Sequence, residues 1–408
     1  MKNENLVPKV RFKGFSDPWE QRKLGEMYYF KNGLNKGKEF FGFGTPIVNF
    51  VDVFHNRGLY AQNLNGRVNL TEKEINNFRV HKGDIFFTRT SETIEEIGFP
   101  SVMLSEPQDT VFSGFVLRGR SLEKPGQLVN IFKKYVFFTN AFRKEMVTKS
   151  SMTTRALTSG TALSAMRVKF PLEATEQKKI GELITRLDYL IAANEDKLEQ
   201  LKTLKKLMMQ KIFSQKWRFK GFTDPWEQRK LKKFTKSYSG GTPSVTNSNY
   251  YGGEIPFIRS AEIRSSQTEL YLTHKGLEES SSKLVEKGDI LYALYGATSG
   301  QVGISKVNGA INQAVLAIIP TEGDSSVFIE QWLSLKKERI ISKYLQGGQG
   351  NLSGKIVMNL TVNKPRIPKE EGMIGKLLGK IDYLIAANED KLNQLKKLKK
   401  YLMQNMFV

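Results

Sequence analysis

The stretch Arg11-Phe-Lys-Gly-Phe-Ser-Asp-Pro-Trp-Glu-Gln-Arg-Lys-Leu24 occurs twice in this chain of 408 residues. It returns as Arg218-Phe-Lys-Gly-Phe-Thr-Asp-Pro-Trp-Glu-Gln-Arg-Lys-Leu231, and the replacement of Ser16 by Thr223 is the one difference between the copies. A match of this length cannot arise by chance. It indicates that one structural plan is used twice in the chain.

A second repeat closes each half of the chain. Leu187-Asp-Tyr-Leu-Ile-Ala-Ala-Asn-Glu-Asp-Lys-Leu198 returns as Ile381-Asp-Tyr-Leu-Ile-Ala-Ala-Asn-Glu-Asp-Lys-Leu392. Between the repeats, short islands align, such as Lys82-Gly-Asp-Ile85 with Lys287-Gly-Asp-Ile290. The layout is therefore a constant segment, a variable domain and a constant helix, written once in each half. It predicts two modules of one fold that carry different specificities on a common frame.

The closing repeats lie within two predicted long helices, residues 180–213 and 374–408. Apolar residues recur there at heptad a, d and e positions, and neither Pro nor Gly interrupts the first helix after Gly181. At 1.5 Å per residue, the first helix forms a rod of roughly 51 Å. The residues expected at the helix-pair or subunit interface are Leu187, Leu190, Asn194, Leu198 and Leu201 in the first helix, and Ile381, Leu384, Asn388, Leu392 and Leu395 in the second.

Each apolar stripe is wider than a bare a/d seam, so each helix needs a partner along its length. The simplest partner is the other copy, paired antiparallel in a pseudo-twofold arrangement with one globular module at each end. Asn194 and Asn388 occupy a positions in the middle of their helices. They are either a solvated notch or buried polar residues that fix the register of the pair, and we favour the second interpretation.

The remaining sequence, residues 1–179 and 214–373, is typical of two modules of the α+β class. Short β-branched and aromatic runs such as Ile85–Phe87 are bounded by Gly, Ser, Asn or Pro clusters. Helix-like stretches, Gln127–Thr148 and Ser326–Leu345, accompany these runs. We therefore expect two globular domains, each a small twisted sheet with helices, joined by the two long antiparallel helices.

The chain is strongly basic, with 63 Lys and Arg against 41 Asp and Glu and a net charge of +22. Most of the excess lies on the modules, +10 for residues 1–179 and +7 for residues 214–373. A protein this basic usually meets a polyanion, either nucleic acid or an anionic membrane surface. The longest apolar runs, such as Ala314–Ile319, are far too short to span a membrane, so we expect no membrane association and favour nucleic acid.

The composition also excludes several kinds of catalytic and metal-binding site. The chain has no Cys, which excludes disulfides, thiolate metal sites and thiol nucleophiles, and its three His lie far apart. Residues 1–15 contain no secretory signal, so we expect a cytoplasmic protein. The stretch from Gly350 to Lys355 lacks a complete phosphate-loop pattern, Glu195-Asp196-Lys197 fits a solvated helix face, and the Asn/Asp-Pro-Pro-aromatic motif of amino-methyltransferases does not occur. We expect no catalytic residues and no metal site.

The first module contains a strand that leads into a polar cluster. Lys82 lies in the Lys-Gly-Asp turn before the strand, and Thr88, Arg89, Thr90 and Ser91 end it. Hydroxyls or an Arg fork at a strand exit can reach base edges in the major groove, while Lys and backbone N–H groups hold phosphates. The competing interpretation is a hairpin with an ordinary solvated loop, and Lys-Gly-Asp itself is better explained as turn chemistry.

Further candidates for DNA contact lie in other polar runs. The runs Lys149–Arg155 and Gln346–Asn351 occupy corresponding places shortly before each constant helix, and both can equally be flexible connections. Trp19 and Trp226 are the same in both copies and are expected to pack in the cores. The remaining candidates are Ser151, Thr153, Thr154 and Arg155 in the first module, and Arg259, Ser260, Tyr292, Tyr295, Thr298, Ser299, Gln346, Gln349 and Asn351 in the second.

In this arrangement the chain resembles the specificity (S) subunits of type I restriction-modification enzymes. The resemblance covers the whole chain and rests first on the repeats that open and close each half. Gly240-Gly-Thr-Pro-Ser244, Tyr251–Ser260, Leu294-Tyr-Gly-Ala-Thr298 and Ile311-Asn-Gln-Ala314 also look like segments of this family's recognition domains. The first module departs from these and has Phe87-Thr-Arg-Thr90 instead.

The resemblance implies a non-catalytic subunit that binds a bipartite duplex DNA target. Residues 1–179 and 214–373 would be target-recognition domains, one per half-site, and residues 180–213 and 374–408 would be spacer helices. Two modification (methyltransferase) subunits would dock on the helices, and restriction/translocase subunits would join them. S-adenosylmethionine, ATP and Mg would be bound by those partner subunits. Two alternatives stay open, a basic RNA-binding or coiled-coil adaptor and a self-contained methyltransferase or nuclease.

Overall fold

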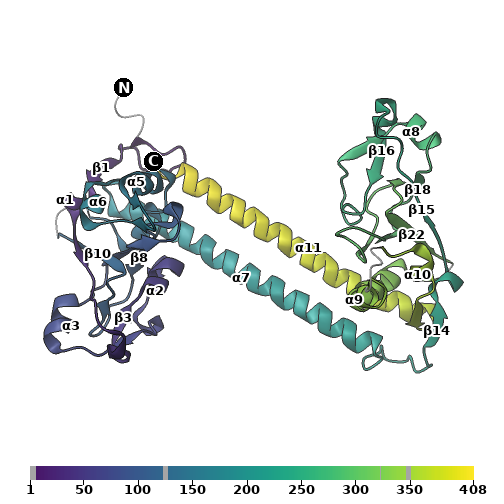
Figure 1. The fold of residues 1–408 in the computed structure, drawn as a ribbon, viewed down its shortest axis with the longest axis horizontal. Coiled ribbons are helices and arrows are strands. Elements are labelled where there is room, and N and C mark those ends of the chain that lie inside the picture. The colour runs from purple at the N-terminus through teal and green to yellow at the C-terminus, as the bar shows by residue number, and fades with distance from the viewer. Residues whose placement is uncertain (1–5, 123–126, 322, 346–350) are drawn as a thin grey trace. The chain divides into compact units, whose positions relative to one another are not determined.

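The computed structural model describes residues 6–122, 127–321, 323–345 and 351–408. The chain divides into two compact units, Met1–Glu195 with Lys391–Val408, and Asp196–Asp390. Each unit contains one globular module and one segment of each long helix, α7 (Ala174–Phe213) and α11 (Pro368–Asn405) (Figure 1). Both modules combine small sheets with helices, which confirms the predicted α+β class.

The centre of the first module is a five-stranded sheet. Its order is β2 (Tyr28–Asn32), β10 (Val116–Ser121), β6 (Ile85–Thr88), β8 (Pro100–Met103) and β4 (Gly58–Leu59), and β4 pairs with β8 in parallel. Strand β6 is buried on both faces because its side chains alternate between two cores. Ile85 and Phe87 pack with the residues of α4 (Asn130–Val136) and α5 (Asn140–Lys149), whereas Phe86 packs with Val53 of α2 (Phe50–His55).

Shorter elements complete the first module. One three-stranded sheet has the order β5 (Arg67–Val68), β3 (Phe41–Val48) and β9 (Val111–Phe112). Another has the order β11 (Ser151–Met152), β12 (Ala156–Leu157) and β7 (Thr90–Ser91). The short helices are α1 (Leu24–Met27), α3 (Glu72–Phe78) and α6 (Gly160–Ala165).

The second module follows the same plan with two four-stranded sheets. The first has the order β15 (Thr235–Ser239), β22 (Val315–Pro320), β19 (Ile290–Ala293) and β20 (Val302–Ile304). The second has the order β17 (Leu270–Leu272), β16 (Tyr251–Ile258), β21 (Gly309–Ile311) and β18 (Lys283–Val285). Helices α8 (His274–Glu278), α9 (Ser326–Tyr344) and α10 (Gly354–Met358) cover them, and β19 alternates between two cores as β6 does.

The repeated residues build an equivalent frame in each unit. Strand β1 (Glu20–Lys23) pairs antiparallel with β13 (Arg167–Phe170), and β14 (Glu227–Lys230) pairs antiparallel with β23 (Thr361–Lys364) in the corresponding register. Trp19 and Trp226 precede these strands and are 1% and 8% exposed. Their rings make edge contacts with phenylalanines of the two cores, which confirms that both tryptophans are core residues.

A buried ion pair joins the constant segment to the start of each long helix. The guanidinium of Arg11 binds both carboxylate oxygens of Glu176 at 2.7 and 2.8 Å, and Arg218 binds Glu370 in the same way at 2.9 and 2.8 Å. Both carboxylates are 1% exposed. The helices begin at Ala174 and Pro368, before the predicted starts at residues 180 and 374. The prediction missed the first turn of each helix because that turn buries a carboxylate and therefore shows no apolar heptad in the sequence. Pro368 suits the first position of α11, where a backbone N–H would have no helical partner.

In each unit, the segments of α7 and α11 lie antiparallel. The first unit contains the ion pairs Glu195–Lys396 (2.6 Å) and Asp188–Lys399. The second contains Lys202–Glu389 (2.7 Å) and Lys205–Asp382 (2.5 Å). Each pair in one unit has its counterpart at the repeat-equivalent positions of the other. The contacts confirm the antiparallel pairing that the apolar stripes predict.

The helix residues named from the sequence divide by burial. Leu187, Ile381 and Leu392 are buried, and Asn194 and Asn388 are each 7% exposed, which excludes the solvated notch. Their role in fixing the register stays a prediction. Leu190, Leu198, Leu201 and Leu395 are half-buried, whereas Leu384 is 44% exposed. Within the described residues, no helix has the length and apolar character that crossing a membrane requires.

Candidate nucleic-acid interface

Two polar runs of the first module, far apart in the sequence, lie on one small sheet. Thr90 and Ser91 form β7, which pairs antiparallel with β12, and β12 pairs with β11, where Ser151 lies. Thr153, Thr154 and Arg155 form the exposed turn between β11 and β12. The structure therefore brings the strand exit after β6 and the run before α6 together on one surface.

Arg89 lies at the junction of this surface with the central sheet. Its backbone N–H donates to Phe115 O at 3.0 Å and its carbonyl accepts from Thr158 N at 3.1 Å, which fixes the main chain on both sides. The guanidinium makes one long contact to Gly114 O at 3.4 Å and lines a hollow of about 500 Å³. Most of its N–H donors thus remain available to a ligand, as base or phosphate recognition requires.

The hollow at Arg89 also contains residues that the sequence did not single out. Phe30 and Asn32 of β2 line it, together with Ser159 and Thr161 at the start of α6. No local motif marks these positions, because they meet Arg89 through strand pairing and the placement of α6. The Ser159 hydroxyl accepts a hydrogen bond from Ala162 N at 3.1 Å, which is the one signal visible in advance as a helix cap.

Arg155 forms an exposed ion pair with a carboxylate. Its guanidinium lies 3.1 Å from Glu92, and the two side chains are 64% and 76% exposed. A pair this exposed contributes little to stability and is readily exchanged for another anion. Arg155 can therefore leave Glu92 for a phosphate at small cost.

Burial removes two of the predicted contacts. Thr88 is 0% exposed and its hydroxyl accepts a hydrogen bond from Phe99 N at 2.9 Å. Tyr292 is also 0% exposed and belongs to the core beneath α9. These side chains have no surface for a duplex, so we correct both assignments to core residues. Ser91 and Ser299, at 7% and 8% exposed, offer a duplex little surface.

Lys82 lies at the opposite end of β6 from Arg89, so the structure does not bring them together. The Lys-Gly-Asp segment closes a turn in which Asp84 accepts a hydrogen bond from His81 N at 2.9 Å and Gly83 has a φ of +91°. The second module repeats the turn with Asp289 and Gly288. The interpretation of Lys-Gly-Asp as turn chemistry is confirmed.

The second module builds a comparable surface at the same point of its plan. The chain leaves β19 into the loop that contains Tyr295, Thr298 and Ser299, and Tyr295 forms an antiparallel bridge with Asn351. Leu352 N donates to Leu294 O at 2.9 Å beside that bridge. The exit of the central strand and the run before the last short helix thus meet in both modules. Gln346 and Gln349 lie outside the described residues.

Arg259 is held by two carboxylates. Its guanidinium binds Glu262 at 3.0 and 3.2 Å and Glu269 at 2.5 Å, and hydrogen bonds with these partners raise the pKa of Arg259 further above its ordinary value. Ser260 beside it is half-buried. Arg259 therefore offers less free charge to DNA than Arg89 does.

Comparisons with known proteins agree on one family. The family model for the type I restriction modification DNA specificity domain matches residues 223–397. A putative type I restriction enzyme MjaX specificity subunit of Methanocaldococcus jannaschii is 25% identical, over 98% of this chain and 95% of the relative. The MjaIX specificity subunit of the same organism is 31% identical over 45% of this chain and 44% of its own. The crystal structure of a type I restriction-modification S subunit from M. genitalium has a similar fold, with a TM-score of 0.68 over 98% of this chain and 99% of that one at 14% identity.

Proposed function

Because the chain belongs to the specificity subunits of type I restriction-modification systems, we propose that it reads a two-part sequence in duplex DNA, one part with each module. The surface around Arg89 and the β11–β12 turn contacts one half-site. The loop after β19, with Asn351, contacts the other. The chain itself performs no catalysis and serves as the recognition subunit.

One observation carries this proposal. The constant segments and helix repeats of the frame are nearly identical in the two halves, whereas the surfaces at the exits of β6 and β19 have different residues at the same point of the plan. Two different surfaces on equivalent frames suit two unlike half-sites. The net charges of +10 and +7 on the modules supply the electrostatic attraction to phosphates that such binding needs.

The long helices would serve as the spacer and as the docking site for partner subunits. We propose that the antiparallel helices form a pseudo-twofold arrangement and that this pair sets the spacing between the half-sites. Each unit exposes apolar side chains on its helix segments, Tyr189 and Leu398 in the first and Leu204 and Tyr383 in the second, between 45% and 73% exposed, which fits the docking of two modification subunits. The restriction/translocase subunits join that complex. S-adenosylmethionine, ATP and Mg are bound by those partners.

The experiment that tests the function maps methylated adenines genome-wide in cells that carry the whole system, with and without this chain. A two-part motif with a fixed gap, lost when the chain is removed and restored when it is supplied again, is the expected result. An absent motif, or one that persists without the chain, would overturn the proposal. Comparable affinity of the purified chain for structured RNA and for the preferred duplex would instead favour the RNA-binding adaptor.

A further inference from the structure

A hollow of about 620 Å³ in the second unit lies outside the surfaces assigned above. It is lined by α9, by the β14–β23 pair and by Phe213 at the end of α7. Trp332 and Tyr344 of α9 line its apolar part, and Gln228, Asn359 and Asn363 add amide groups. Its volume lies in the range of ordinary ligand sites.

Three cations line one side of this hollow. Lys336, Arg339 and Lys343 project from α9 at spacings that place them on one face of the helix. None of the lining residues that the structure describes is acidic, and these three cations have no carboxylate within 4.0 Å in the described part of the chain. Three positive charges over a polar hollow attract an anionic partner.

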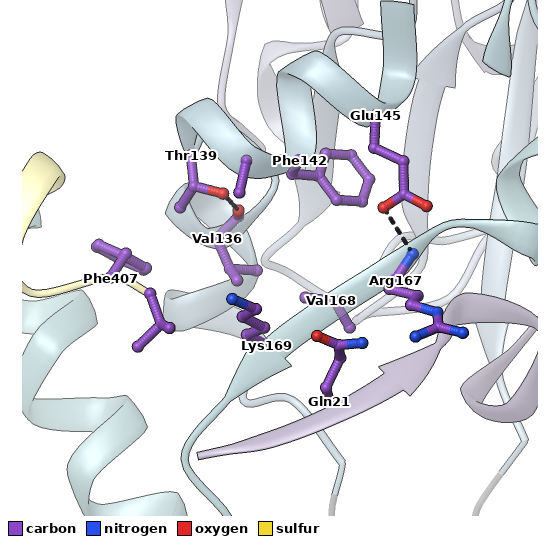
Figure 2. Close-up of a pocket in the computed structure, with 11 residues that line it drawn as sticks. Gln21, Val136, Thr139, Phe142, Glu145, Arg167, Val168, Lys169 and Phe407 are labelled. Atoms are coloured by element: carbon purple, nitrogen blue, oxygen red, sulfur yellow. Dashed lines mark hydrogen bonds between the residues drawn. The ribbon is translucent and has the colours of Figure 1, made fainter. Parts of the chain in front are cut away.

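The equivalent place in the first unit has a different character. Gln21 and Lys169 pair across β1 and β13 as Gln228 and Asn363 pair across β14 and β23, and Phe407 is the repeat counterpart of Phe213. That hollow has a volume of about 140 Å³ and includes Glu145, whose carboxylate accepts a hydrogen bond from Arg167 N at 3.0 Å (Figure 2). The larger basic hollow is therefore a property of the second variable module and is not imposed by the frame.

The helix that carries the basic face, α9, also supports the proposed recognition loop. A methyl group built on Gly300 would lie 2.9 Å from Ile341 Cδ1 and 3.3 Å from Lys337 Cγ, so the end of the loop packs directly on this helix. Lys337 and Ile341 follow the hollow-lining residues Lys336 and Ile340 by one position each. At 100° per residue, the loop contacts lie about 150° around α9 from the centre of the three cations, so one helix carries the loop and the cations on different faces.

We propose that Lys336, Arg339 and Lys343 bind phosphates of duplex DNA beside the half-site that the second module reads. The inference rests on the proposed function and extends its DNA contact to a backbone-holding surface. Cations that meet phosphates contribute affinity and register without reading bases. A duplex is favoured over an acidic protein segment because the recognition loop of the same module packs on α9, the helix that carries the cations.

The test measures binding of the assembled complex to a target duplex and to a non-target duplex over a range of salt concentrations. In the variant Lys336→Gln/Arg339→Gln/Lys343→Gln, the slope of log K against log salt should become shallower by about 2 to 3, at about 0.9 per lost phosphate contact. Affinity should fall by the same factor for both duplexes, and the methylated motif should not change. Lys336→Arg/Lys343→Arg, which keeps the charge, should retain the wild-type slope.

A matched control separates a local contact from the loss of net charge. Lys369→Gln/Lys376→Gln/Lys380→Gln removes three exposed cations from α11 in the same unit and should leave most of the slope intact. An unchanged slope in the α9 variant, or an equal loss in the control, overturns the inference. So does failure of the α9 variant to assemble with the partner subunits, which would assign the hollow to an acidic protein segment. If the wild-type complex does not discriminate between the duplexes, the proposed function itself fails.

Discussion

Glu330 is a buried member of a polar network that ties α9 to both long helices in the second unit. Its carboxylate accepts a hydrogen bond of 2.6 Å from Gln331 Nε2, and the same amide donates to Asp382 of α11 at 2.6 Å. Lys205 of α7 pairs with Asp382, and Arg264 approaches Glu330 to 4.0 Å. Burial, opposed by the charges of Lys205 and Arg264 and reinforced by that of Asp382, raises the pKa of Glu330 to about 7.

This pKa makes the stability of the unit depend on pH. The folded chain holds the Glu330 proton more tightly than the unfolded chain, whose carboxyl titrates near 4.5. The stabilising contribution of the proton is therefore complete below pH 4.5 and is lost as the pH rises through 7. A pKa difference of about 2.5, at 1.36 kcal/mol for each pKa unit, corresponds to about 3 kcal/mol. Glu330→Gln removes this titration, so its unfolding free energy relative to the wild type should rise by up to about 3 kcal/mol between pH 5 and pH 8.

Urea unfolding at pH 5, 6, 7 and 8, followed by tryptophan fluorescence, measures the effect. Trp332 and Trp226 are buried in the same unit, at 6% and 8% exposed, and report its unfolding. Glu338→Gln on the exposed side of α9 is the control for the change of net charge. Curves of unfolding free energy against pH that run parallel for wild type and Glu330→Gln would refute the reasoning, as would an equal response of the control.

Three further predictions concern the frame, the recognition surface and the spacer. Arg218→Ala leaves a buried carboxylate without its partner and should lower the unfolding free energy of the second unit by about 3–5 kcal/mol, and Arg11→Ala should do the same in the first unit; an unchanged urea midpoint would contradict this. Arg89→Ala should relax the methylated motif in one half-site if the guanidinium reads a base, or weaken binding to every sequence and flatten the salt slope if it holds a phosphate. A heptad inserted near Asn194 and another near Asn388 add about 10.5 Å to the rod and should widen the gap by up to about three base pairs with both half-sequences intact; altered half-sequences in the methylation map would count against a spacer.

The frame could be predicted because its contacts join repeated residues to repeated residues. Glu195 pairs with Lys396 and Glu389 with Lys202, so a repeat that is visible in the sequence carries its own antiparallel partner. The heptad stripe then gives the helices and their buried face. The first turn of each helix escaped detection because it buries a glutamate instead of an apolar residue.

The proposed recognition surfaces were harder to predict because tertiary pairing assembles them. Sequence patterns do not reveal that β7 pairs with β12, since the two strands are short and far apart. Thr88 was misplaced because a strand buried on both faces lacks the polar alternation that marks an exposed residue. Arg259 did carry a warning, because Glu262 follows it at the spacing of a local ion pair.

The bidentate contacts of Arg11 with Glu176 and of Arg218 with Glu370 have an evolutionary consequence. Both partners of each pair are frame residues, so neither depends on what the intervening variable segment encodes. Mutations that change the loops after β6 or β19 leave these anchors untouched. Natural selection can therefore replace one target preference by another while the inherited scaffold keeps its stability.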